Sequence, residues 1–530
     1  MAPAHGLKVL AEPSRERRTN GKIWLAPVPR GIPVAISSMM RRATSFITLL
    51  ALVPMAAAMA GGDFTVAQLQ SVVLSGQHPV FGGGITTGER FGRACTGLGD
   101  VDADGVPDIA VGSRSDQDGG TDAGAVYVVL MNRDLSPKAA IKLGPGSGGV
   151  PTNWIASGDM FGYGVAGIGD LDGDGTPDLA ITSPNAEPAG TPTTANRGAL
   201  FICFLRPDGS ARAVTRIDDT NGLPLANGDS CGQGCAHLGD LDGDGFTEVG
   251  LGAPGTDDQG FNRGVVHIVS LRPDGTMLRQ TTLGQGVAPS LMLDDIDNFG
   301  GRGLARLGDL DGDGAIEVAV GCYRDDDGGV DAGAVWILSL RGIAGGAFVI
   351  ERTAKISGTQ GGLTTPLADD DLFGMTVAPL GDLNQDGIAD IAIGNNKDDI
   401  GATDIGAVVL AGLSSAGAVN TERVIAQGSG FPGLTLIPGE RFGRALANLG
   451  DLRGDGSVVL GVGAGAGVNG GRLWMIVIGA QRSPDLNHDG TVDGADLSLL
   501  LAAWSLSGPT DLDWSGSTTG ADLSALLGAW

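Results

Sequence analysis

The chain has 530 residues, 42% of them apolar, and is therefore long enough to bury a large core. Acidic residues outnumber basic residues by 61 to 34, which gives a formal net charge of −27 at pH 7. This balance argues against binding to nucleic acid, whose phosphates require a basic surface.

The N-terminal part contains a pattern typical of a secretory signal peptide. Basic residues precede an apolar run over residues 46–58, and Ala58-Met59-Ala60 forms a cleavage site of the Ala-x-Ala type. The run is too short and wrongly flanked for a transmembrane helix. We expect translation to begin at Met39 or Met40, and the mature protein to be secreted, either extracellular or associated with the cell envelope. Residues 1–38 are then a non-native or disordered extension, and residues 39–60 are the signal peptide.

An acidic loop of the form Asp-x-Asp-x-Asp-Gly-x-x-Asp/Glu recurs five times, at intervals of about 70 residues. Side chains at loop positions 1, 3, 5 and 9 supply oxygen ligands, and the backbone carbonyl of position 7 adds another. The predicted ligands are Asp100, Asp102, Asp104, Val106 and Asp108; Asp170, Asp172, Asp174, Thr176 and Asp178; Asp240, Asp242, Asp244, Phe246 and Glu248; Asp309, Asp311, Asp313, Ala315 and Glu317; and Asp382, Asn384, Asp386, Ile388 and Asp390.

Four acidic side chains within nine residues repel one another unless a cation neutralises them. Hard oxygen ligands in a flexible cage suit Ca²⁺ better than Mg²⁺, and they do not suit zinc. The alternative is a set of solvated Asp-Gly turns, but five copies in register favour calcium. A sixth copy has Arg453 and Val459 at positions 3 and 9, so we expect it not to bind.

These loops are not EF-hands, because position 12 of the first copy is Val111 rather than a bidentate acid. Short β-branched runs bounded by glycine follow the loops and are typical of buried strands, as in Asp108-Ile-Ala-Val-Gly. Each loop is therefore predicted to join two strands.

The loops belong to a longer repeat. A unit begins with Phe-Gly (Cys231-Gly232 in the third), and its third strand opens with Gly-Ala-Val or a variant, as at Gly124. A weaker fourth strand closes each unit. Four strands per unit around an axis predict an all-β fold, a β-propeller.

The blade count follows from the two ends of the repeat region. Six copies of the first three strands run from Phe91 to about Ile478, and residues 67–74 resemble a fourth strand without an earlier partner. This strand is predicted to complete the sixth blade and close the ring. Six blades are expected, with seven as the alternative.

The Phe-Gly pairs, the acidic loops, Gly252-Ala253-Pro254 and the Gly-Ala-Val openings together resemble FG-GAP repeats, the repeats of the integrin α-chain propeller. The resemblance covers roughly residues 64–480, and the predicted propeller domain spans residues 61–480. It implies calcium sites on one face of the propeller and an extracellular protein or glycan ligand on the opposite face. Integrin propellers have seven blades, so six would be a departure.

Five cysteines are too few for a disulfide framework, and their number is odd. Cys231 and Cys235 could form a local bridge. Packing as small apolar residues is the alternative.

Residues 481–530 differ in composition and contain two loop–helix halves, 26 residues apart. Each loop carries ligand-type residues and an acid at position 12, followed by an apolar helical segment. The predicted ligands are Asp485, Asn487, Asp489, Thr491, Asp493 and Asp496 in the first half, and Asp511, Asp513 and Asp522 in the second. Ser515 and Thr519 replace carboxylates in the second half, which predicts weaker calcium binding there.

The two halves resemble a dockerin domain, a small α-helical calcium-binding module. The resemblance implies a cohesin-like partner on a scaffold or on the cell envelope. A calcium-stapled tail without a partner is the alternative.

The loops between the second and third strands share acidic clusters, for example Asp116, Asp118, Asp257, Asp258, Asp325, Asp326, Asp327, Asp398 and Asp399. They either contact a basic or cation-bridged ligand or are solvated polar turns.

An enzyme, such as a polysaccharide- or ester-acting hydrolase or lyase, is the competing class. The chain leaves no room for a separate catalytic domain, and it lacks Gly-x-Ser-x-Gly and His-Glu-x-x-His motifs. His267 falls in a predicted strand and His488 in a calcium loop, so neither is a convincing general base. A non-enzymatic binding or adhesion protein is therefore the preferred prediction.

Overall fold

The computed structural model describes residues 66–82, 85–86, 88–188, 195–288, 290–343, 345–384, 386–428, 434–465, 471–480, 486, 492–505, 518 and 520–529. The predicted extension, residues 1–38, and the predicted signal peptide, residues 39–60, lie outside these ranges.

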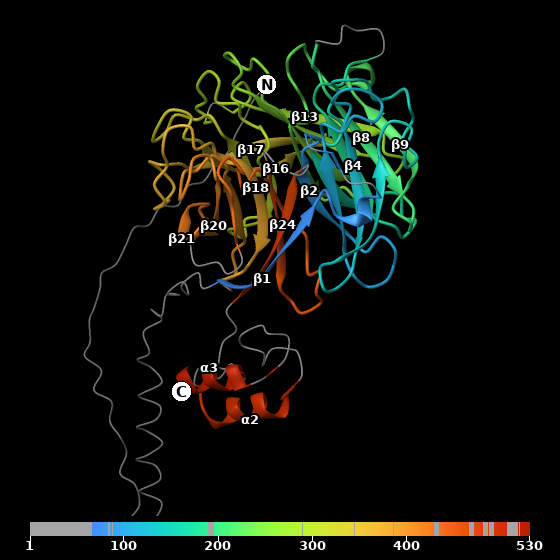
Figure 1. Ribbon diagram of the computed structural model, residues 1–530. Helices are drawn as coiled ribbons and strands as arrows, with labels where there is room; N and C mark the ends of the chain where they lie inside the picture. The colour runs from blue at the N-terminus through green and yellow to red at the C-terminus, as the bar shows by residue number, and fades with distance from the viewer. Residues whose placement is uncertain are drawn as a thin grey trace, which may run out of the picture. The chain divides into compact units, whose positions relative to one another are not determined.

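The repeats fold into six antiparallel sheets of four strands each, which we call blades 1 to 6 (Figure 1). Blade 1 contains β2 (Phe91–Gly99), β3 (Asp108–Ser113), β4 (Ala125–Met131) and β5 (Pro137–Leu143). Blade 2 contains β6 (Val165–Gly169), β7 (Asp178–Ser183), β8 (Ala199–Leu205) and β9 (Ala211–Ile217). Blade 3 contains β10 (Gly234–Gly239), β11 (Thr247–Ala253), β12 (Val265–Leu271) and β13 (Met277–Leu283).

The other three blades follow the same order. Blade 4 contains β14 (Leu304–Gly308), β15 (Ile316–Cys322), β16 (Ala334–Ile343) and β17 (Ala347–Ile356). Blade 5 contains β18 (Phe373–Gly381), β19 (Asp390–Asn395), β20 (Ala407–Leu413) and β21 (Val419–Ile425). Blade 6 contains β22 (Ala445–Asn448), β23 (Val458–Ala464), β24 (Arg472–Ala480) and β1 (Val66–Ser75). Two short 3₁₀ helices, η1 (Pro79–Phe81) and η2 (Asp219–Asn221), lie in connections between strands.

The first strands of successive blades contact one another, and β2 of blade 1 contacts β22 of blade 6, which closes the ring. The N-terminal strand β1 supplies the fourth strand of blade 6 by pairing antiparallel with β24, with Val72 opposite Met475. Figure 1 shows β1, in blue, alongside β24, in orange-red. The predicted propeller, its six blades and its closing strand are confirmed for the described residues.

The two repeated sequence signatures meet at each boundary between blades. The Phe-Gly pair of blade 2 forms a bridge with the glycine that opens the third strand of blade 1, Phe161 opposite Gly124. A Cβ on Gly124 would lie 2.1 Å from the carbonyl oxygen of Phe161, so the close approach requires glycine. The five phenylalanines of the Phe-Gly pairs are completely buried, and Cys231 takes their place in blade 3 with 2% of its surface exposed.

The core consists of apolar clusters packed between neighbouring blades. Second and third strands are almost entirely buried, as in β3 and β4, because sheets cover both of their faces. All five cysteines are free thiols, and four of them are buried, so the packing alternative holds and Cys231 and Cys235 form no bridge.

The C-terminal part contains α2 (Gly494–Ala502) and α3 (Gly520–Ala529). The two helices pack together through Leu500 and Leu526, both completely buried. Among the described residues, no helix combines the length and the apolar character needed to cross a bilayer.

Candidate metal centres in the acidic loops

Each predicted acidic loop joins the first strand of a blade to the second, as expected. In blade 1 the loop begins at Asp100, directly after β2, and ends at Asp108, the first residue of β3. Because strands alternate in direction, the five loops and their sixth copy lie on one face of the propeller. Connections from second to third strands, and from one blade to the next, lie on the opposite face, which we call the distal face.

The backbone of each loop wraps around the carboxylate of position 1. In blade 1 the Asp100 carboxylate accepts hydrogen bonds from the backbone N–H groups of Asp104 (3.0 Å) and Gly105 (2.7 Å). The Asp104 carboxylate accepts one from Val106 N–H (2.9 Å). Blades 2, 3 and 4 repeat the bond to the position-6 N–H, at Gly175, Gly245 and Gly314. The carbonyl role of position 7 stays a prediction.

The acid at position 9 is buried and also braces the blade. Asp108 accepts hydrogen bonds from Val101 N–H and from Met131 N–H in β4, both of 2.9 Å. Asp178 does the same with Leu171 and Leu205 in blade 2. Burial, together with the neighbouring acids, raises the pKa of Asp108 to about 6 despite these bonds. A nearby cation would stabilise the ionised form of such a buried carboxylate.

Three acids of each loop converge in blades 1 to 4. One carboxylate oxygen from each of three residues lies within 4.8 Å of the other two, in these groups: Asp100, Asp102 and Asp108; Asp170, Asp172 and Asp178; Asp240, Asp242 and Glu248; Asp309, Asp311 and Glu317. In blade 5, position 3 is Asn384, whose amide oxygen accepts a hydrogen bond from Asp386 N–H. These groups could hold a metal ion.

Unpartnered buried oxygens support that interpretation. The Oδ1 atom of the position-3 aspartate is buried without a hydrogen-bond donor in blades 1, 2 and 3, at Asp102, Asp172 and Asp242. In blade 5 the unpartnered oxygen is Oδ1 of Asp390. Buried anionic oxygens are costly without a partner, and the same atom recurs in three loops. The donor set therefore fits a hard cation.

A basic side chain from the fourth strand also reaches each of the first four loops. Lys138 pairs with Asp102 and with Asp104 (2.7 Å to the latter). The corresponding residues are Arg212 in blade 2, Arg279 in blade 3 and Arg352 in blade 4. In blade 5, Thr421 occupies the place that Arg279 and Arg352 take in blades 3 and 4. These bases would compete with a metal for the outer oxygens.

The sequence interpretation missed these bases, although a signal was present. Lys138 and Arg212 occupy the bulge at the start of the fourth strand, where position 9 is Asp. Arg279 and Arg352 stand one place further on, opposite Ser270 and Ser339 of the third strand, where position 9 is the longer Glu. The position of the base thus changes together with the length of the acid.

The sixth copy keeps the turn without the ligand set. Asp451 accepts hydrogen bonds from Gly454, Asp455 and Gly456, while Arg453 pairs with Asp455 (3.2 Å) and Val459 is completely buried. The turn geometry alone is therefore no evidence for a cation. The converging acids and unpartnered oxygens distinguish the other loops.

In the C-terminal part, two predicted ligands lie at the start of α2. Asp493 caps α2, and Asp496 accepts hydrogen bonds from the N–H groups of Leu486 (2.7 Å) and Asp493 (2.8 Å). Both position-12 acids, Asp496 and Asp522, are completely buried. The predicted ligands Asp485, Asn487, Asp489, Thr491, Asp511 and Asp513 lie outside the described residues.

The acidic loops of the distal face are not simply solvated turns. Their first acids, Asp116, Asp325 and Asp398, are buried, whereas Asp257, Asp326 and Asp399 are exposed. Asp325 pairs with Lys355 at 2.7 Å and belongs to a buried trio with Asp297 and Cys322. The buried acids hold turns, and the exposed acids remain available to a ligand.

Comparison with known proteins agrees with this architecture. The family model of the FG-GAP repeat matches residues 161–201 and 373–410, which run from the first to the third strand of blades 2 and 5. The chain is 32% identical to integrin alpha-PS5 of Drosophila melanogaster over 176 residues, and 28% identical to integrin alpha-4 of Xenopus laevis over 175 residues. Each match covers 32% of this chain and 15% of the relative. A match to human integrin alpha-IIb, 28% identical over 165 residues, covers 29% of the chain and 14% of the relative.

The chain is thus a six-bladed β-propeller whose repeats match the FG-GAP model in blades 2 and 5 and which is similar to part of integrin α chains, an architecture consistent with adhesion or binding.

Proposed function

We propose that this protein is a secreted, non-enzymatic binding or adhesion protein whose propeller carries Ca²⁺ in five acidic loops. The proposed ligands are the residues predicted above for the five loops. Ca²⁺ would screen the converging carboxylates, and the chain supplies the cage, the bracing hydrogen bonds and the competing bases.

The single observation that carries the binding role is a set of exposed apolar side chains on the distal face. Phe261 (57% exposed) lies in the second-to-third connection of blade 3, and Val330 (64%) lies in that of blade 4. Met292 (78%) and Ile296 (42%) lie in the connection between these blades. Ile296 N–H donates to the Phe261 carbonyl over 2.8 Å, so these connections are joined.

Exposed apolar side chains with an acidic surround are typical of interaction sites. Asp295 hydrogen-bonds to Phe261 N–H, and Asp326 and Asp331 flank Val330. We infer that the ligand is an extracellular protein or glycan that offers apolar and basic, or cation-bridged, groups.

The proposed C-terminal role is docking. The buried position-12 acids and the paired helices support a dockerin-like module with a cohesin-like partner. The first half is the expected calcium site.

The alternative is a propeller-based hydrolase or lyase. Among the described histidines, His267 is buried beside Thr282, and burial lowers its pKa to about 4. A histidine without contact to solvent is a poor general base, which favours the binding role.

The test is capture of envelope components of the source organism by the full-length mature protein, with Ca²⁺ and with chelator. The double variant Phe261→Ser and Met292→Ser should lose the distal-face ligand, while Val349→Ser, an exposed valine of β17, should retain it. Deletion of residues 483–530 should remove only the cohesin-like partner. Ligand capture that is unaffected by the distal substitutions would contradict the proposal, and cleavage of a captured glycan would favour the enzyme.

A further inference from the structure

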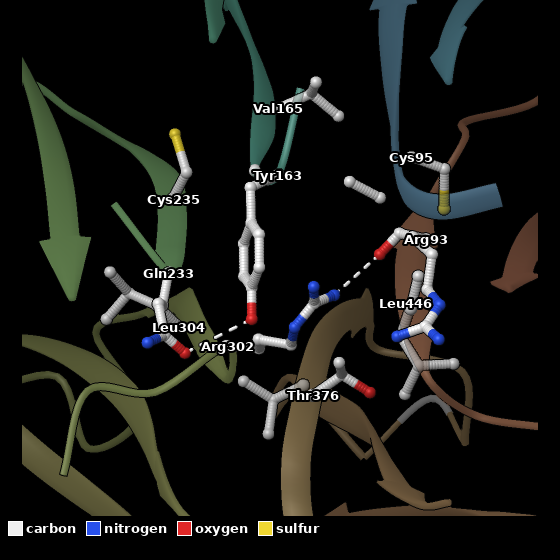
Figure 2. Close-up of a pocket in the computed structure, with 14 residues that line it drawn as sticks. Arg93, Cys95, Tyr163, Val165, Gln233, Cys235, Arg302, Leu304, Thr376 and Leu446 are labelled. Atoms are coloured by element: carbon white, nitrogen blue, oxygen red, sulfur yellow. Dashed lines mark hydrogen bonds between the residues drawn. The ribbon is translucent and has the colours of Figure 1, made fainter. Parts of the chain in front are cut away.

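Polar side chains from several blades converge at the distal end of the ring axis. The residue after Phe-Gly, or after Cys-Gly in blade 3, is Arg93, Tyr163, Gln233 and Arg444 in blades 1, 2, 3 and 6. In blade 4 the basic residue, Arg302, comes one place later. Residues of all six blades line a cavity of about 60 Å³ here, and Figure 2 shows the Tyr163 hydroxyl and the Arg302 and Arg93 side chains around it.

The arginines of this cluster lack an acidic partner in the part of the chain that the structure describes. Arg93 and Arg114 are only 6% and 8% exposed. Within the described residues, no carboxylate lies within 4 Å of the guanidinium groups of Arg93, Arg114, Arg302 or Arg444. The net charge of the chain is −27, so this concentration of positive charge is unusual.

Several guanidinium N–H groups of these arginines have no hydrogen-bond acceptor among the described residues. Buried donors without an acceptor are Nε and Nη1 of Arg93, Nε of Arg114, Nη2 of Arg302 and Nε of Arg444. The bond that Arg302 does make is to the backbone carbonyl of Arg93 (2.8 Å). Burial lowers the pKa of Arg93, and the neighbouring arginine charges lower it further. A buried cation without a counter-charge is costly.

The ring of Tyr163 contacts two of these cations. The guanidinium carbons of Arg302 and Arg114 lie 4.0 Å and 4.8 Å from the centre of its ring. Its hydroxyl donates to Gln233 (3.3 Å). Burial raises the pKa of Tyr163, but the positive charges of Arg302 and Arg114 lower it more, to about 7. The cluster therefore favours negative charge even on a phenol.

Water can accept hydrogen bonds from these donors but cannot supply the missing charge. Guanidinium groups bind oxyanions through paired N–H donors, and converging arginines are the usual device for phosphate, sulfate or carboxylate. The size of the cavity restricts the bound group to a small head. We infer that the distal end of the propeller axis is an oxyanion-binding site formed by Arg93, Arg302 and Arg444, with Arg114 and Tyr163 completing it.

This site is separate from the acidic loops, which lie on the opposite face, and it does not depend on the proposed function. The oxyanion is either a free tetrahedral ion or a carboxylate group, because both match the same donors.

The first test follows Tyr163 by the near-ultraviolet absorbance of tyrosinate, in the full-length mature protein. The chain has three tyrosines. Burial raises the pKa of Tyr127 well above its usual value and that of Tyr323 to about 12, so these two do not interfere. The charged groups that act on Tyr163 are Arg302, Arg114 and Arg444, and Tyr323 is a further titratable neighbour. Arg93 lines the same cavity, and Asp122 lies near Arg114. A bound anion competes with tyrosinate for the positive charges of the arginines. Sulfate keeps the same charge over the pH range of the titration. It should therefore raise the pKa of Tyr163 relative to chloride at equal ionic strength.

The second test is calorimetric titration with sodium sulfate, sodium phosphate and sodium acetate. Arg93→Gln and Arg302→Gln should each weaken binding roughly tenfold or more, because each removes charge-assisted hydrogen bonds. Arg197→Gln, whose guanidinium pairs with Asp219 and Asn227, is the matched control and should bind as the wild type does. Tighter binding of sulfate or phosphate than of acetate identifies a tetrahedral ion as the ligand. Tighter binding of acetate identifies a carboxylate.

Two outcomes would overturn the inference. One is an unchanged Tyr163 titration in sulfate, and the other is equal anion binding by the wild type and Arg93→Gln. Folding of the variants is checked by their thermal transitions in chloride, where loss of an unpaired buried charge should leave the melting temperature equal or higher.

Discussion

The carboxylate of Asp108 accepts a hydrogen bond of 2.9 Å from the backbone N–H of Met131. This bond ties the end of the first acidic loop to the third strand of the same blade. The acid of position 9 therefore has two roles, as a brace of the blade and as a proposed metal ligand.

Asp108→Ala should destabilise the protein even without calcium. The substitution leaves the buried N–H groups of Val101 and Met131 without acceptors, which costs about 2 kcal/mol. Chemical denaturation in chelator measures the change. Asp102→Ala is the control, because its carboxylate accepts no backbone hydrogen bond among the described residues. In chelator it loses only the exposed pair with Lys138, so its main effect should appear with Ca²⁺ present. Equal losses of unfolding free energy for both variants in chelator would contradict a bracing role of Asp108 that is separate from metal binding.

Lys138→Gln should make the protein more dependent on calcium. The Lys138 ammonium pairs with Asp102 and Asp104 and so neutralises the loop while competing with a metal. Without it, the melting temperature should fall in chelator and the increase caused by Ca²⁺ should become larger. Arg133→Gln removes a base that binds backbone carbonyls rather than the acids and serves as the control. A smaller response to Ca²⁺ in Lys138→Gln would show that the ammonium does not compete.

Asp297 should make the unfolding free energy depend on pH. Burial, together with the nearby charge of Asp325, raises its pKa to about 7, although its carboxylate accepts a hydrogen bond from Asp294 N–H (2.8 Å). A folded-state pKa above the unfolded value means that the contribution to stability is complete below pH 4 and is lost as the pH rises through 7.

Asp297→Asn keeps an acceptor and removes the charge. Its stability relative to the wild type should therefore increase between pH 4 and pH 7 in chelator, by an amount on the order of a few kcal/mol. Asp295→Asn, an exposed acid two residues earlier that pairs with Arg263, should show no such trend. Parallel pH profiles for the wild type and Asp297→Asn would refute the prediction.

Leu74→Ala should weaken the closure of the ring. Leu74 lies in β1 and is only 2% exposed, so its truncation leaves a cavity and costs about 2–4 kcal/mol. Val73, its neighbour on the opposite side of the strand, is 38% exposed, and Val73→Ala should cost much less. Denaturant titration compares the two. Similar effects would mean that β1 contributes only backbone pairing.

The sequence by itself determined the features that repeat locally. The order of strands, the six blades, the closing strand over residues 67–74 and the positions of the acidic loops all follow from signals that recur at one period. Such signals can be recognised in the sequence because each blade needs the same residues at the same places. Phe-Gly lies at one end of the first strand, and the acidic turn lies at the other.

Only the tertiary structure decided which distant charges meet. Lys138 is 36 residues from Asp102, yet strand pairing brings them together. Arg93 and Arg302 are 209 residues apart, and they meet because the first strands of all blades converge on one axis. Within its own repeat, none of these side chains belongs to a sequence pattern that marks it as part of a charge cluster. Their chemistry arises from closure of the ring, which local sequence patterns do not encode.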